Sequence, residues 1–547
     1  MSLNLADLTE ALVDAVPDRV ALVCGNDTRT FAEFDAGANR IAHHIVAQGV
    51  QPGDHVGLHA RNSIEFVEAL LGCLKVRAVP VNVNFRYVDT ELTYLYNDAH
   101  LKAVIADGEF SDVIADVLPK CPELRHIVLI GQAAGPALSE AADAVGVSVA
   151  DYHAAAADRS PERDFPERSN DDLYVIYTGG TTGMPKGVMW RHEDFYFAAL
   201  SGGNLMGPPI LSGAELGAAA AANTHPMSFL LTAPLMHGAA AYSLFTCMFM
   251  GSEHVLMPRF DPVEALSLID RHKIRGVQLV GDAIARPLAD AIEQHGDRFD
   301  LGSLLSIGSG GALWSASVRE KLQKLLPNVY LRNGFGSSES GNNGELVASA
   351  DGLLRMSPSP RVRVVDTDFA TIEPGSDEIG YLAHVGHVPV GYYNDPVKTA
   401  ATFPVVDGVR LSVLGDLARV EADGSIVVLG RGSSCINTGG EKVYAEEVEE
   451  AIKSHPDIED ALVAGIEDPT YGQRVSAVVQ ARDGAPAPDH DNLIAHCRTQ
   501  IAGYKVPRTV VVVPEIVRSP AGKADYRWAK ATLEGAVSTS STSEDLS

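Results

Sequence analysis

The sequence predicts an α/β protein of at least two domains, and three observations support this. The first part of its 547 residues alternates short apolar runs with segments whose apolar residues recur at helical period. After about residue 355 the apolar runs become shorter and turn residues separate them, and a second alternating block begins past Gly430. Strands that alternate with helices imply parallel sheets covered on both faces. A chain of this length also exceeds what one hydrophobic core usually organises.

Two helix starts in the first half follow from local spacing. Thr30 and Glu33 stand ahead of apolar residues that recur at helical period until Gly49, which is a capping-box pattern. Asn62-Ser-Ile-Glu65 has the same spacing ahead of a second apolar helix, predicted to end near Lys75. The strands expected around these helices and after them are 20–23, 56–58, 78–83, 103–106, 127–130, 255–257, 276–280 and 304–307.

The second half of the sequence predicts shorter strands, followed by a separate block of helices and strands. Asp423-Gly424 is typical of a hairpin turn. The strands expected before and after it are 362–365, 380–384, 417–420 and 425–429. The later block has expected helices at 446–454 and 491–500 and expected strands at 460–463, 474–480 and 509–513, enough to fold alone. We therefore expect an N-terminal domain over 1–430, a C-terminal domain over 431–535 and, from its Ser/Thr-rich composition, a disordered tail over 536–547.

Composition excludes several classes of function. The formal net charge of −28 argues against a nucleic-acid partner and against attraction to an anionic membrane surface. It leaves a nucleotide site open, because local N–H groups and a few cations can hold a phosphate. The six cysteines lie far apart without a C-x-x-C pair, which fits a reducing, cytoplasmic compartment and gives no disulfide or metal framework.

One uncharged segment, 227–251, is long enough to be tested as a membrane span. Pro234 and His237-Gly238 interrupt it and leave about 13 uninterrupted apolar residues, which is too short to cross a bilayer. A strand, a loop and a helix are expected instead. The N-terminus lacks the basic start of a signal peptide. We therefore expect no transmembrane segment, while peripheral membrane contact and a homo-oligomer stay open.

The segment from Tyr177 to Gly187 has the composition of a phosphate-binding loop. Glycines let backbone N–H groups converge on an anion, Thr hydroxyls add donors, and Lys186 supplies a mobile charge. It is not a Walker A loop, because Pro185 precedes the lysine and Gly187 follows it. The residues expected to contact phosphate are Thr178, Gly179, Gly180, Thr181, Thr182, Gly183 and Lys186.

Other segments also combine glycine with polar side chains. Gly308–Ala312 follows a predicted strand and is small enough for a flat ring to lie on its backbone. Gly334–Glu339 brings an aromatic ring, two hydroxyls and a carboxylate together. The remaining candidates are Asp416, Arg431, the second glycine loop with Gly439, Gly440, Glu441 and Lys442, and Lys523 near the C-terminus.

In their order and spacing, these segments resemble those of the adenylate-forming superfamily, which contains acyl-CoA synthetases, carrier-protein adenylation domains and beetle luciferases. The match extends from about residue 10 to about residue 530. Arg191-His-Glu-Asp194 and Gly281–Pro287 are most similar to actinobacterial CoA ligases of fatty acid and steroid side-chain degradation. The resemblance implies stacked, mostly parallel sheets with helices and a small β-barrel-like subdomain in a large N-terminal domain. A small α+β C-terminal domain would move as a lid.

The resemblance also implies ATP, Mg²⁺ and coenzyme A, and it assigns roles in the nucleotide site. Gly310, Gly311 and Ala312 would form one wall of the adenine pocket, and Phe335 would stack on the other face. Ser338 and Glu339 would lie at the α-phosphate, with Glu339 as the Mg²⁺ ligand. The neighbouring members of this expected site are Gly334, Gly336 and Ser337.

Further roles implied by the resemblance concern the ribose, the acyl group and the lid. Asp416 would accept hydrogen bonds from the ribose hydroxyls, with Arg431 nearby. His237 would line the acyl channel, and Gly439–Lys442 would line the pantetheine tunnel. Lys523 would bridge the α-phosphate and the acyl carboxylate. The expected catalytic residues are thus Lys523, Glu339, Thr178, Lys186 and His237.

The implied activity is that of an ATP-dependent acyl-CoA synthetase acting on a small-molecule carboxylic acid. The acid and ATP give an acyl-adenylate and pyrophosphate, and coenzyme A then gives the thioester and AMP. The segments expected near the acyl group are mostly small or apolar, with no Arg or Lys to pair with a second carboxylate. The residues concerned are Val277, Leu279, Val280, Gly281, Ala239 and Ala240. A medium- or long-chain fatty acid or a steroid side-chain carboxylate is therefore expected.

Alternatives from other classes stay open. A stand-alone adenylation enzyme could load a carrier protein in trans, since only about twenty residues follow Arg527, too few for a carrier domain. A luciferase-like oxygenase would share the adenylation residues. A non-catalytic nucleotide-binding protein would be expected to lack Lys523 or Glu339, and both are present.

Overall fold

The chain's computed structural model divides into two compact units. The first contains Met1–Leu313, Leu325–Asn343 and Gly386–Ser412, and the second contains Trp314–Lys324, Gly344–Val385 and Val413–Ser547. The residues that the structure describes are 2–178, 184–205, 207–311, 314–348, 353–431, 435–438, 441–468, 472–486, 489–501, 503–518 and 524–544.

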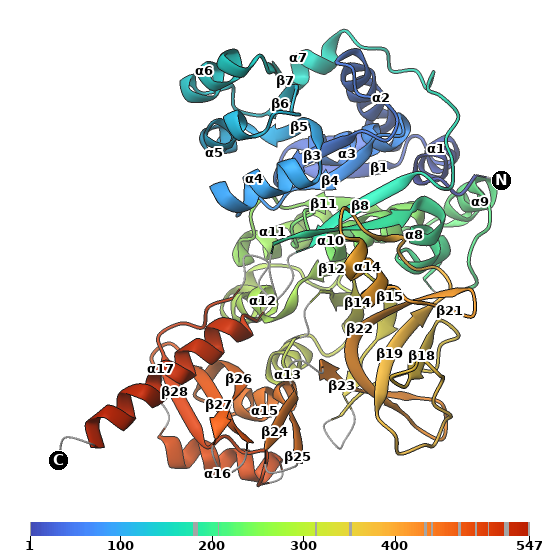
Figure 1. Cartoon of the computed structure of the whole chain (residues 1–547). Helices are drawn as coiled ribbons and strands as arrows, with labels where there is room; N and C mark the ends of the chain where they lie inside the picture. The colour runs from blue at the N-terminus through green and yellow to red at the C-terminus, as the bar shows by residue number, and fades with distance from the viewer. Residues whose placement is uncertain are drawn as a thin grey trace. The chain divides into compact units, whose positions relative to one another are not determined.

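One sheet of the first unit has the strand order β20-β9-β8-β4-β3-β5-β6-β7 (Figure 1). Strands β8, β4, β3, β5, β6 and β7 run parallel, whereas β9 and β20 are antiparallel to their neighbours. The bounds are β3 His55–His59, β4 Val79–Asn82, β5 Leu101–Asp107, β6 His126–Ile130, β7 Ser148–Asp151, β8 Leu173–Thr178, β9 Lys186–Arg191 and β20 Gly391–Tyr392.

Helices cover both faces of this sheet, as the alternation of strands and helices predicts. Ala103 and Ile105 of β5 pack into one core with α2 and α3, while Val104 and Ala106 pack into another with α4, α5 and α6. The pleat explains this division, since successive residues of a strand point to opposite faces. These helices and α7 are α2 Phe31–Ala47, α3 Ile64–Lys75, α4 Asp89–Asp98, α5 Ser111–Val117, α6 Pro136–Val145 and α7 Tyr152–Ala157.

A second sheet of this unit has the order β15-β14-β13-β12-β10-β11-β1-β2. Strands β14, β13, β12, β10, β11 and β1 are parallel, and β2 pairs antiparallel with β1. The strands are β1 Val20–Cys24, β2 Asp27–Thr30, β10 Ser228–Leu231, β11 Glu253–Leu256, β12 Gly276–Leu279, β13 Ser306–Ser309, β14 Tyr330–Ser337 and β15 Gly341–Glu345. The other helices of this unit are α1 Leu5–Ala15, α8 His192–Ala198, α9 Gly213–Ala222, α10 Gly238–Phe249, α11 Pro262–His272, α12 Gly281–His295 and α14 Pro396–Thr402.

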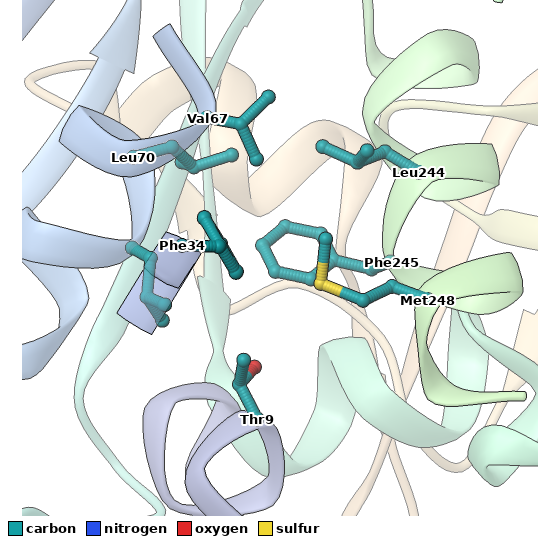
Figure 2. Close-up of a pocket in the computed structure, with 8 residues that line it drawn as sticks. Thr9, Phe34, Val67, Leu70, Leu244, Phe245 and Met248 are labelled. Carbon is teal, nitrogen blue, oxygen red and sulfur yellow. The ribbon is translucent and has the colours of Figure 1, made fainter. Parts of the chain in front are cut away.

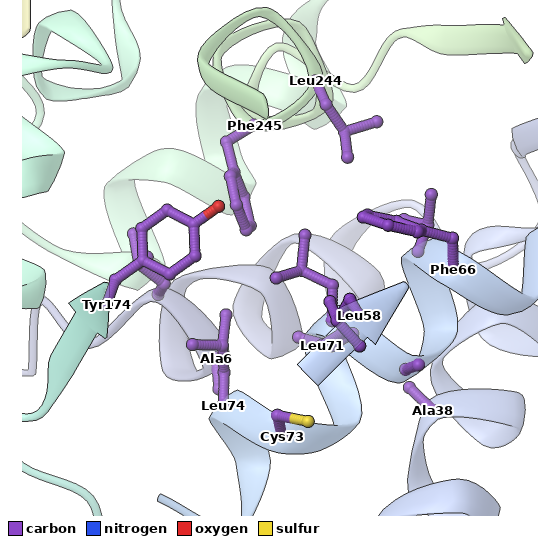
Figure 3. Packing of buried hydrophobic residues seen from close by; sticks show 14 of the residues in the cluster. Ala6, Ala38, Leu58, Phe66, Leu71, Cys73, Leu74, Tyr174, Leu244 and Phe245 are labelled. Atoms are coloured by element: carbon purple, nitrogen blue, oxygen red, sulfur yellow. The ribbon is translucent and has the colours of Figure 1, made fainter. Parts of the chain in front are cut away.

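Helix α10 is held by apolar packing against both the first sheet and helix α3. The rings of Tyr174 on β8 and Phe245 on α10 meet edge to face at 6.3 Å (Figure 3). Figure 2 shows a small apolar cavity where Leu244 and Met248 of α10 face Val67 of α3. Because α10 begins at Gly238, this packing fixes the position of the His237 segment that precedes it.

The second unit contains an antiparallel sheet and an α+β region. The antiparallel sheet has the order β16-β17-β23-β22-β19-β18, and β21 pairs with β22. Its strands are β16 Val347–Ala348, β17 Leu354–Met356, β18 Val362–Val365, β19 Gly380–Val385, β22 Val409–Val420 and β23 Ile426–Arg431. Strand β21 Val405–Val406 and the first residues of β22, up to Ser412, belong to the first unit. The α+β region has the order β25-β24-β27-β26, with β28 parallel to β27. Its elements are β24 Cys435–Thr438, β25 Glu441–Tyr444, α15 Ala445–Lys453, β26 Ile458–Asp468, β27 Gly472–Ala481, α16 His490–Gln500, β28 Thr509–Val513 and α17 Tyr526–Glu544, and α13 Ala316–Leu325 also belongs to this unit.

The structure confirms the α/β class and most predicted elements. The Thr30–Glu33 capping box is present at the start of α2. The uncharged 227–251 segment forms β10, a loop and α10, as expected, and within the described ranges no helix is long and apolar enough to cross a bilayer.

One expectation about a helix start is wrong. Ser63, not Asn62, caps α3 by accepting from Phe66 N, while the Asn62 side chain bonds to the 233–235 segment instead. The expected domain boundary at residue 430 and the disordered tail expected over 536–547 stay predictions.

Candidate functional site

The candidate phosphate loop connects two antiparallel strands. Thr178 ends β8 and Lys186 begins β9, and the two residues are opposite each other in the strand pair. Residues 179–183 between them, which the sequence predicts to contact phosphate, lie outside the described residues. Because a strand rather than a helix follows the loop, no helix N-terminus adds its dipole here, which separates the loop further from a Walker A motif.

Lys186 lies beside three charged groups and one aromatic ring. Its Nζ is 5.2 Å from the centroid of the Tyr392 ring. Burial lowers the pKa of Lys186 most, and the nearby Lys398 ammonium lowers it further, while the carboxylates of Asp395 and Glu339 act in the opposite direction. The structure therefore brings together two residues that the sequence predicts for the site, Lys186 and Glu339.

Glu339 is held in a fixed position just after β14. Its backbone N donates to Ser337 Oγ at 3.2 Å, and its carbonyl accepts from Ser412 Oγ at 2.8 Å. On the side chain, Tyr392 OH donates to Glu339 Oε1 at 3.0 Å. The carboxylate is thus oriented by a neutral donor, which leaves its negative charge in place beside Lys186.

The preceding residue, Ser338, is anchored by a tryptophan that the sequence analysis did not single out. Trp190 Nε1 on β9 donates to the Ser338 carbonyl at 2.8 Å, and Trp190 is completely buried. The strand that begins with Lys186 therefore also supports the segment that ends in Glu339. A sequence signal for this contact is weak, because it depends on which strands become neighbours.

The His237 segment reaches the same region from α10. A Cβ added to Gly238 would lie 3.4 Å from Ser338 Oγ and 3.7 Å from Ile176 Cγ2 of β8. Asn82 on β4 joins the two sides: its Nδ2 donates to the carbonyls of Tyr177 and Met236, and its Oδ1 accepts from Tyr177 N at 2.8 Å. Asn82 is a second supporting residue that sequence reasoning missed.

The glycines expected against adenine lie close to the start of α10. Gly311 has φ +83°, and a Cβ there would lie 3.3 Å from Ala239 Cβ. A Cβ at Gly310 would lie 3.2 Å from Gln278 Nε2. Ala312 lies outside the described residues. Both glycines therefore form a surface at the carboxyl ends of β12 and β13, which is where parallel sheets bind ligands.

Residues 334–339 do not show the alternation of buried and exposed residues that is typical of a strand with one buried face. All six, namely Gly334, Phe335, Gly336, Ser337, Ser338 and Glu339, are partly exposed. Tight packing behind them explains two of the glycines: a Cβ at Gly336 would lie 2.2 Å from the Gly341 carbonyl and one at Gly334 would lie 3.0 Å from that of Ser309. The segment is thus fixed from behind and accessible in front.

The expected acyl lining stays a prediction, and the structure adds one polar residue beside it. Val277 and Leu279 share a face of β12 and are buried. Gln278 lies on the other face, and its side-chain amide lies against Gly308 and Gly310. The strand period would have identified this residue, since a one-residue step along a strand changes the face. The surface beside these glycines therefore includes a polar amide.

The second unit holds the remaining candidates. Asp416 on β22 and Arg431 on β23 are directly opposite in register, so residues far apart in sequence become neighbours. Glu441 and Lys442 lie in strand β25, not in a loop or at a helix start. Lys523, Gly439 and Gly440 lie outside the described residues.

The side chains at the site fit a magnesium ion that a substrate helps to hold. Among the described residues, no group of three or more His, Cys, Asp or Glu side chains forms a metal cage. Mg²⁺ commonly binds one or two carboxylates together with substrate phosphates and water. A single oriented carboxylate, Glu339, beside a phosphate-loop lysine matches that pattern.

Comparison with known proteins identifies relatives across the whole chain. The family model of the AMP-binding enzyme matches residues 9–383, and that of the AMP-binding enzyme C-terminal domain matches residues 447–523. A medium/long-chain-fatty-acid–CoA/3-oxocholest-4-en-26-oate–CoA ligase of Mycobacterium tuberculosis (strain ATCC 25618 / H37Rv) is 47% identical over 539 residues, which cover 98% of this chain and 97% of the relative. A 3-oxocholest-4-en-26-oate–CoA ligase of Rhodococcus rhodochrous is 44% identical, with 97% of this chain and 96% of the relative covered.

A solved structure supports the fold. The crystal structure of the anthranilate CoA ligase AuaEII in complex with anthranoyl-AMP matches with a TM-score of 0.82. The match covers 98% of this chain and 99% of that one at 23% sequence identity. At this identity the similarity shows the fold, a large α/β N-terminal part followed by a small C-terminal part.

Proposed function

We propose a function for this chain on the basis of its family. The chain belongs to the AMP-binding enzyme family, whose model matches residues 9–383. The chain is an ATP-dependent, AMP-forming carboxylate–CoA ligase, and its relatives at 44–47% identity are named as CoA ligases. The observation that carries the site assignment is the convergence of Lys186 at the start of β9, Glu339 just after β14, and the His237 segment at the start of α10.

The first half-reaction joins two anions. A carboxylate oxygen of the acid attacks the α-phosphorus of ATP, the bond to the bridging oxygen breaks, and pyrophosphate leaves. Lys186 would neutralise the phosphates, and Glu339 would hold Mg²⁺, which supplies charge stabilisation to the leaving pyrophosphate. No protein nucleophile is required, and the described site contains oriented charges of the kind that this reaction needs.

The second half-reaction transfers the acyl group to a thiol. The coenzyme A sulfur attacks the acyl carbonyl, the bond to the adenylate oxygen breaks, AMP leaves, and the thiol proton passes to solvent. We assign Lys523 to the first step and Gly439–Lys442 to the second, while Asp416 and Arg431 would bind the ribose. These assignments follow from the family resemblance, and the cross-strand pairing of Asp416 with Arg431 supports their acting together. A lid movement between the two steps would replace Lys523 at the site by the Gly439–Lys442 segment.

The acid that we propose is a medium- or long-chain fatty acid or a steroid side-chain carboxylate. The relative from Mycobacterium tuberculosis carries a medium/long-chain fatty acid and 3-oxocholest-4-en-26-oate in its name, and the one from Rhodococcus rhodochrous carries 3-oxocholest-4-en-26-oate alone. The small residues Gly310, Gly311 and Ala239 lie close together beside the candidate adenylate site, with no charged side chain among them. A reducing, cytoplasmic location, where ATP and coenzyme A are abundant, fits the cysteine usage.

A screen of carboxylic acids tests the proposal. Purified protein is given ATP, Mg²⁺ and one acid, and pyrophosphate is measured with and without coenzyme A. We expect coenzyme A-dependent AMP release with C8–C18 fatty acids or with a steroid bearing an acidic side chain. Adenylate formation without thioester formation until a phosphopantetheinyl carrier protein is added would favour the carrier-loading alternative. Absence of pyrophosphate with every acid would contradict the function.

A further inference from the structure

We propose that Tyr392 is a positioning residue that holds the phosphate-loop lysine and the metal-binding carboxylate in one arrangement. The proposal rests on the proposed function for the roles of Lys186 and Glu339, but its evidence is geometric. Tyr392 OH donates to Glu339 Oε1 at 3.0 Å, and the Tyr392 ring centroid lies 5.2 Å from Lys186 Nζ. One side chain therefore contacts both charged groups.

Sheet register explains how one tyrosine reaches both partners. Strand β20 pairs antiparallel with β9, and Tyr392 is opposite Val188. Lys186 stands two residues before Val188 and therefore on the same face of the sheet. A diagonal neighbour at this separation is within reach of an aromatic ring. The contact with Lys186 is thus fixed by strand pairing and not by a free loop.

The two contacts that Tyr392 makes differ from a direct ion pair because they leave both charged groups available to bind Mg²⁺ and phosphate. If Lys186 and Glu339 bonded to each other, each would neutralise the other's charge. The phenol instead donates one hydrogen bond to Oε1, which fixes the rotation of the carboxylate and presents Oε2 to a cation. The ring face attracts the ammonium without neutralising it, so that Lys186 keeps its charge for phosphate. Tyr392 would thereby prepare both groups before the nucleotide binds.

Tyr392 is itself held firmly. Only 7% of its surface is exposed, its backbone N donates to Thr399 Oγ1 at 2.9 Å, and its ring lies 5.3 Å from that of Phe403. The next residue is also tied to β9, because Tyr393 N donates to the Gly187 carbonyl at 2.7 Å. Rigid mounting is what a positioning role requires, since a mobile phenol would not fix its partners.

The test separates the hydroxyl from the ring and measures binding without turnover. Tyr392→Phe keeps the ring and removes the bond to Glu339. Calorimetric titration of ATP in the absence of acid, at a series of Mg²⁺ concentrations, should show a Mg²⁺ requirement raised about tenfold, with ATP affinity at saturating Mg²⁺ changed little. Tyr392→Leu should lower ATP affinity even at saturating Mg²⁺, since Lys186 also loses the ring.

Tyr196→Phe is the matched control. Tyr196 is a buried tyrosine of the same unit whose OH donates to the Ile210 carbonyl at 3.0 Å. It should lose a similar amount of stability but keep the wild-type Mg²⁺ requirement. Equal Mg²⁺ requirements in Tyr392→Phe, Tyr196→Phe and wild type would overturn the proposal, as would wild-type ATP binding that Mg²⁺ does not strengthen. Wild-type protein with Mg²⁺-dependent ATP binding but no activity on any acid would instead contradict only the proposed function.

Discussion

Trp190 Nε1 lies 2.8 Å from the carbonyl oxygen of Ser338, so a completely buried side chain on β9 fixes the residue next to Glu339. The indole N–H thereby finds the acceptor that a buried tryptophan usually needs. The start of β9 carries Lys186 and its fifth residue carries this anchor, which means that one strand positions both the lysine and the carboxylate segment.

The first prediction concerns this anchor. Trp190→Phe should preserve most of the apolar packing but remove the shorter of the two hydrogen bonds to the Ser338 carbonyl, leaving the one from Tyr242 OH at 3.5 Å. We expect a loss of about 1–3 kcal/mol in the free energy of unfolding and a fall in the rate of pyrophosphate release. Urea titration and a pyrophosphate assay measure the two effects. A variant that lost stability but kept the wild-type rate would show that Trp190 supports the fold without supporting the site.

The second prediction uses two neighbouring glycines. Gly311 has φ +83° and its added Cβ would meet Ala239 Cβ at 3.3 Å, whereas an added Cβ at Gly310 would meet the end of the flexible Gln278 side chain at 3.2 Å. Gly311→Ala should therefore cost about 1–2 kcal/mol of stability through backbone strain and weaken ATP binding. Gly310→Ala should cost less stability, since Gln278 can move. Similar costs in urea titration for both variants would contradict the strain argument.

The sequence predicted the elements whose determinants are local. Thr30 and Glu33 satisfy each other within one turn, so their capping box was predictable and is confirmed. The strands of the parallel sheets followed from short apolar runs for the same reason. Asn62 shows the opposite case: its partners, the Ala233 carbonyl and Leu235 N, are far away in sequence. Nothing in the local pattern could assign it to them rather than to the helix start.

The residues of the candidate site also divide into those that local sequence predicts and those that depend on distant partners. Lys186 and Glu339 were predictable because glycine-rich and hydroxyl-rich motifs surround them. Tyr392, Trp190 and Asn82 were not, because each acts through a partner that only strand pairing brings close. Gln278 was overlooked for a different reason: its strand was predicted, but the alternation of faces was not applied to it. Applying the period of the strand would have added Gln278 to the residues expected on the other face from Val277 and Leu279.

The third prediction concerns the packing that positions α10. Leu244 is completely buried and lines the small cavity between α10 and α3 (Figure 2). Leu244→Ala should enlarge this cavity and lower the free energy of unfolding by about 2–5 kcal/mol. Val46→Ala on the exposed side of α2 should cost well under 1 kcal/mol in the same urea titration. A loss below 1 kcal/mol for Leu244→Ala would mean that α10 relaxes into the space.

The fourth prediction concerns pH. His126 and His44 contact each other through Nε2 atoms 2.8 Å apart, and burial, followed by the neighbouring His44, lowers the pKa of His126 from 6.5 to about 4. The folded state thus binds fewer protons than the unfolded state. Stability contributed by neutral His126 is therefore present above pH 6.5 and is lost as the pH falls from 6.5 to 4, by about 3 kcal/mol in total.

His126→Gln should remove this part of the pH dependence. Urea titrations at pH 7.5 and 4.5 should differ by about 2–3 kcal/mol less in the variant than in wild type. His153→Gln, at a site whose side chain is 64% exposed, should leave the difference unchanged. An unchanged difference in His126→Gln would mean that other buried histidines carry the pH dependence.

The last prediction separates the two half-reactions. Lys523 is assigned to the step in which the acid attacks the α-phosphate, where two negative groups approach each other. Removing a cation from such a step typically costs about 10²–10³ in rate, because charge that develops in the transition state loses its partner. Lys523→Ala should therefore reduce adenylate formation by at least this factor, measured as ATP–pyrophosphate exchange. Thioester formation from a supplied acyl-adenylate and coenzyme A should change by only a few fold, since Lys523 has no part in that step.

Lys530→Ala, on the exposed side of α17, is the control for this prediction and should leave both rates unchanged. Equal losses in both half-reactions for Lys523→Ala would show that the lysine supports the lid as a whole and not the first step alone.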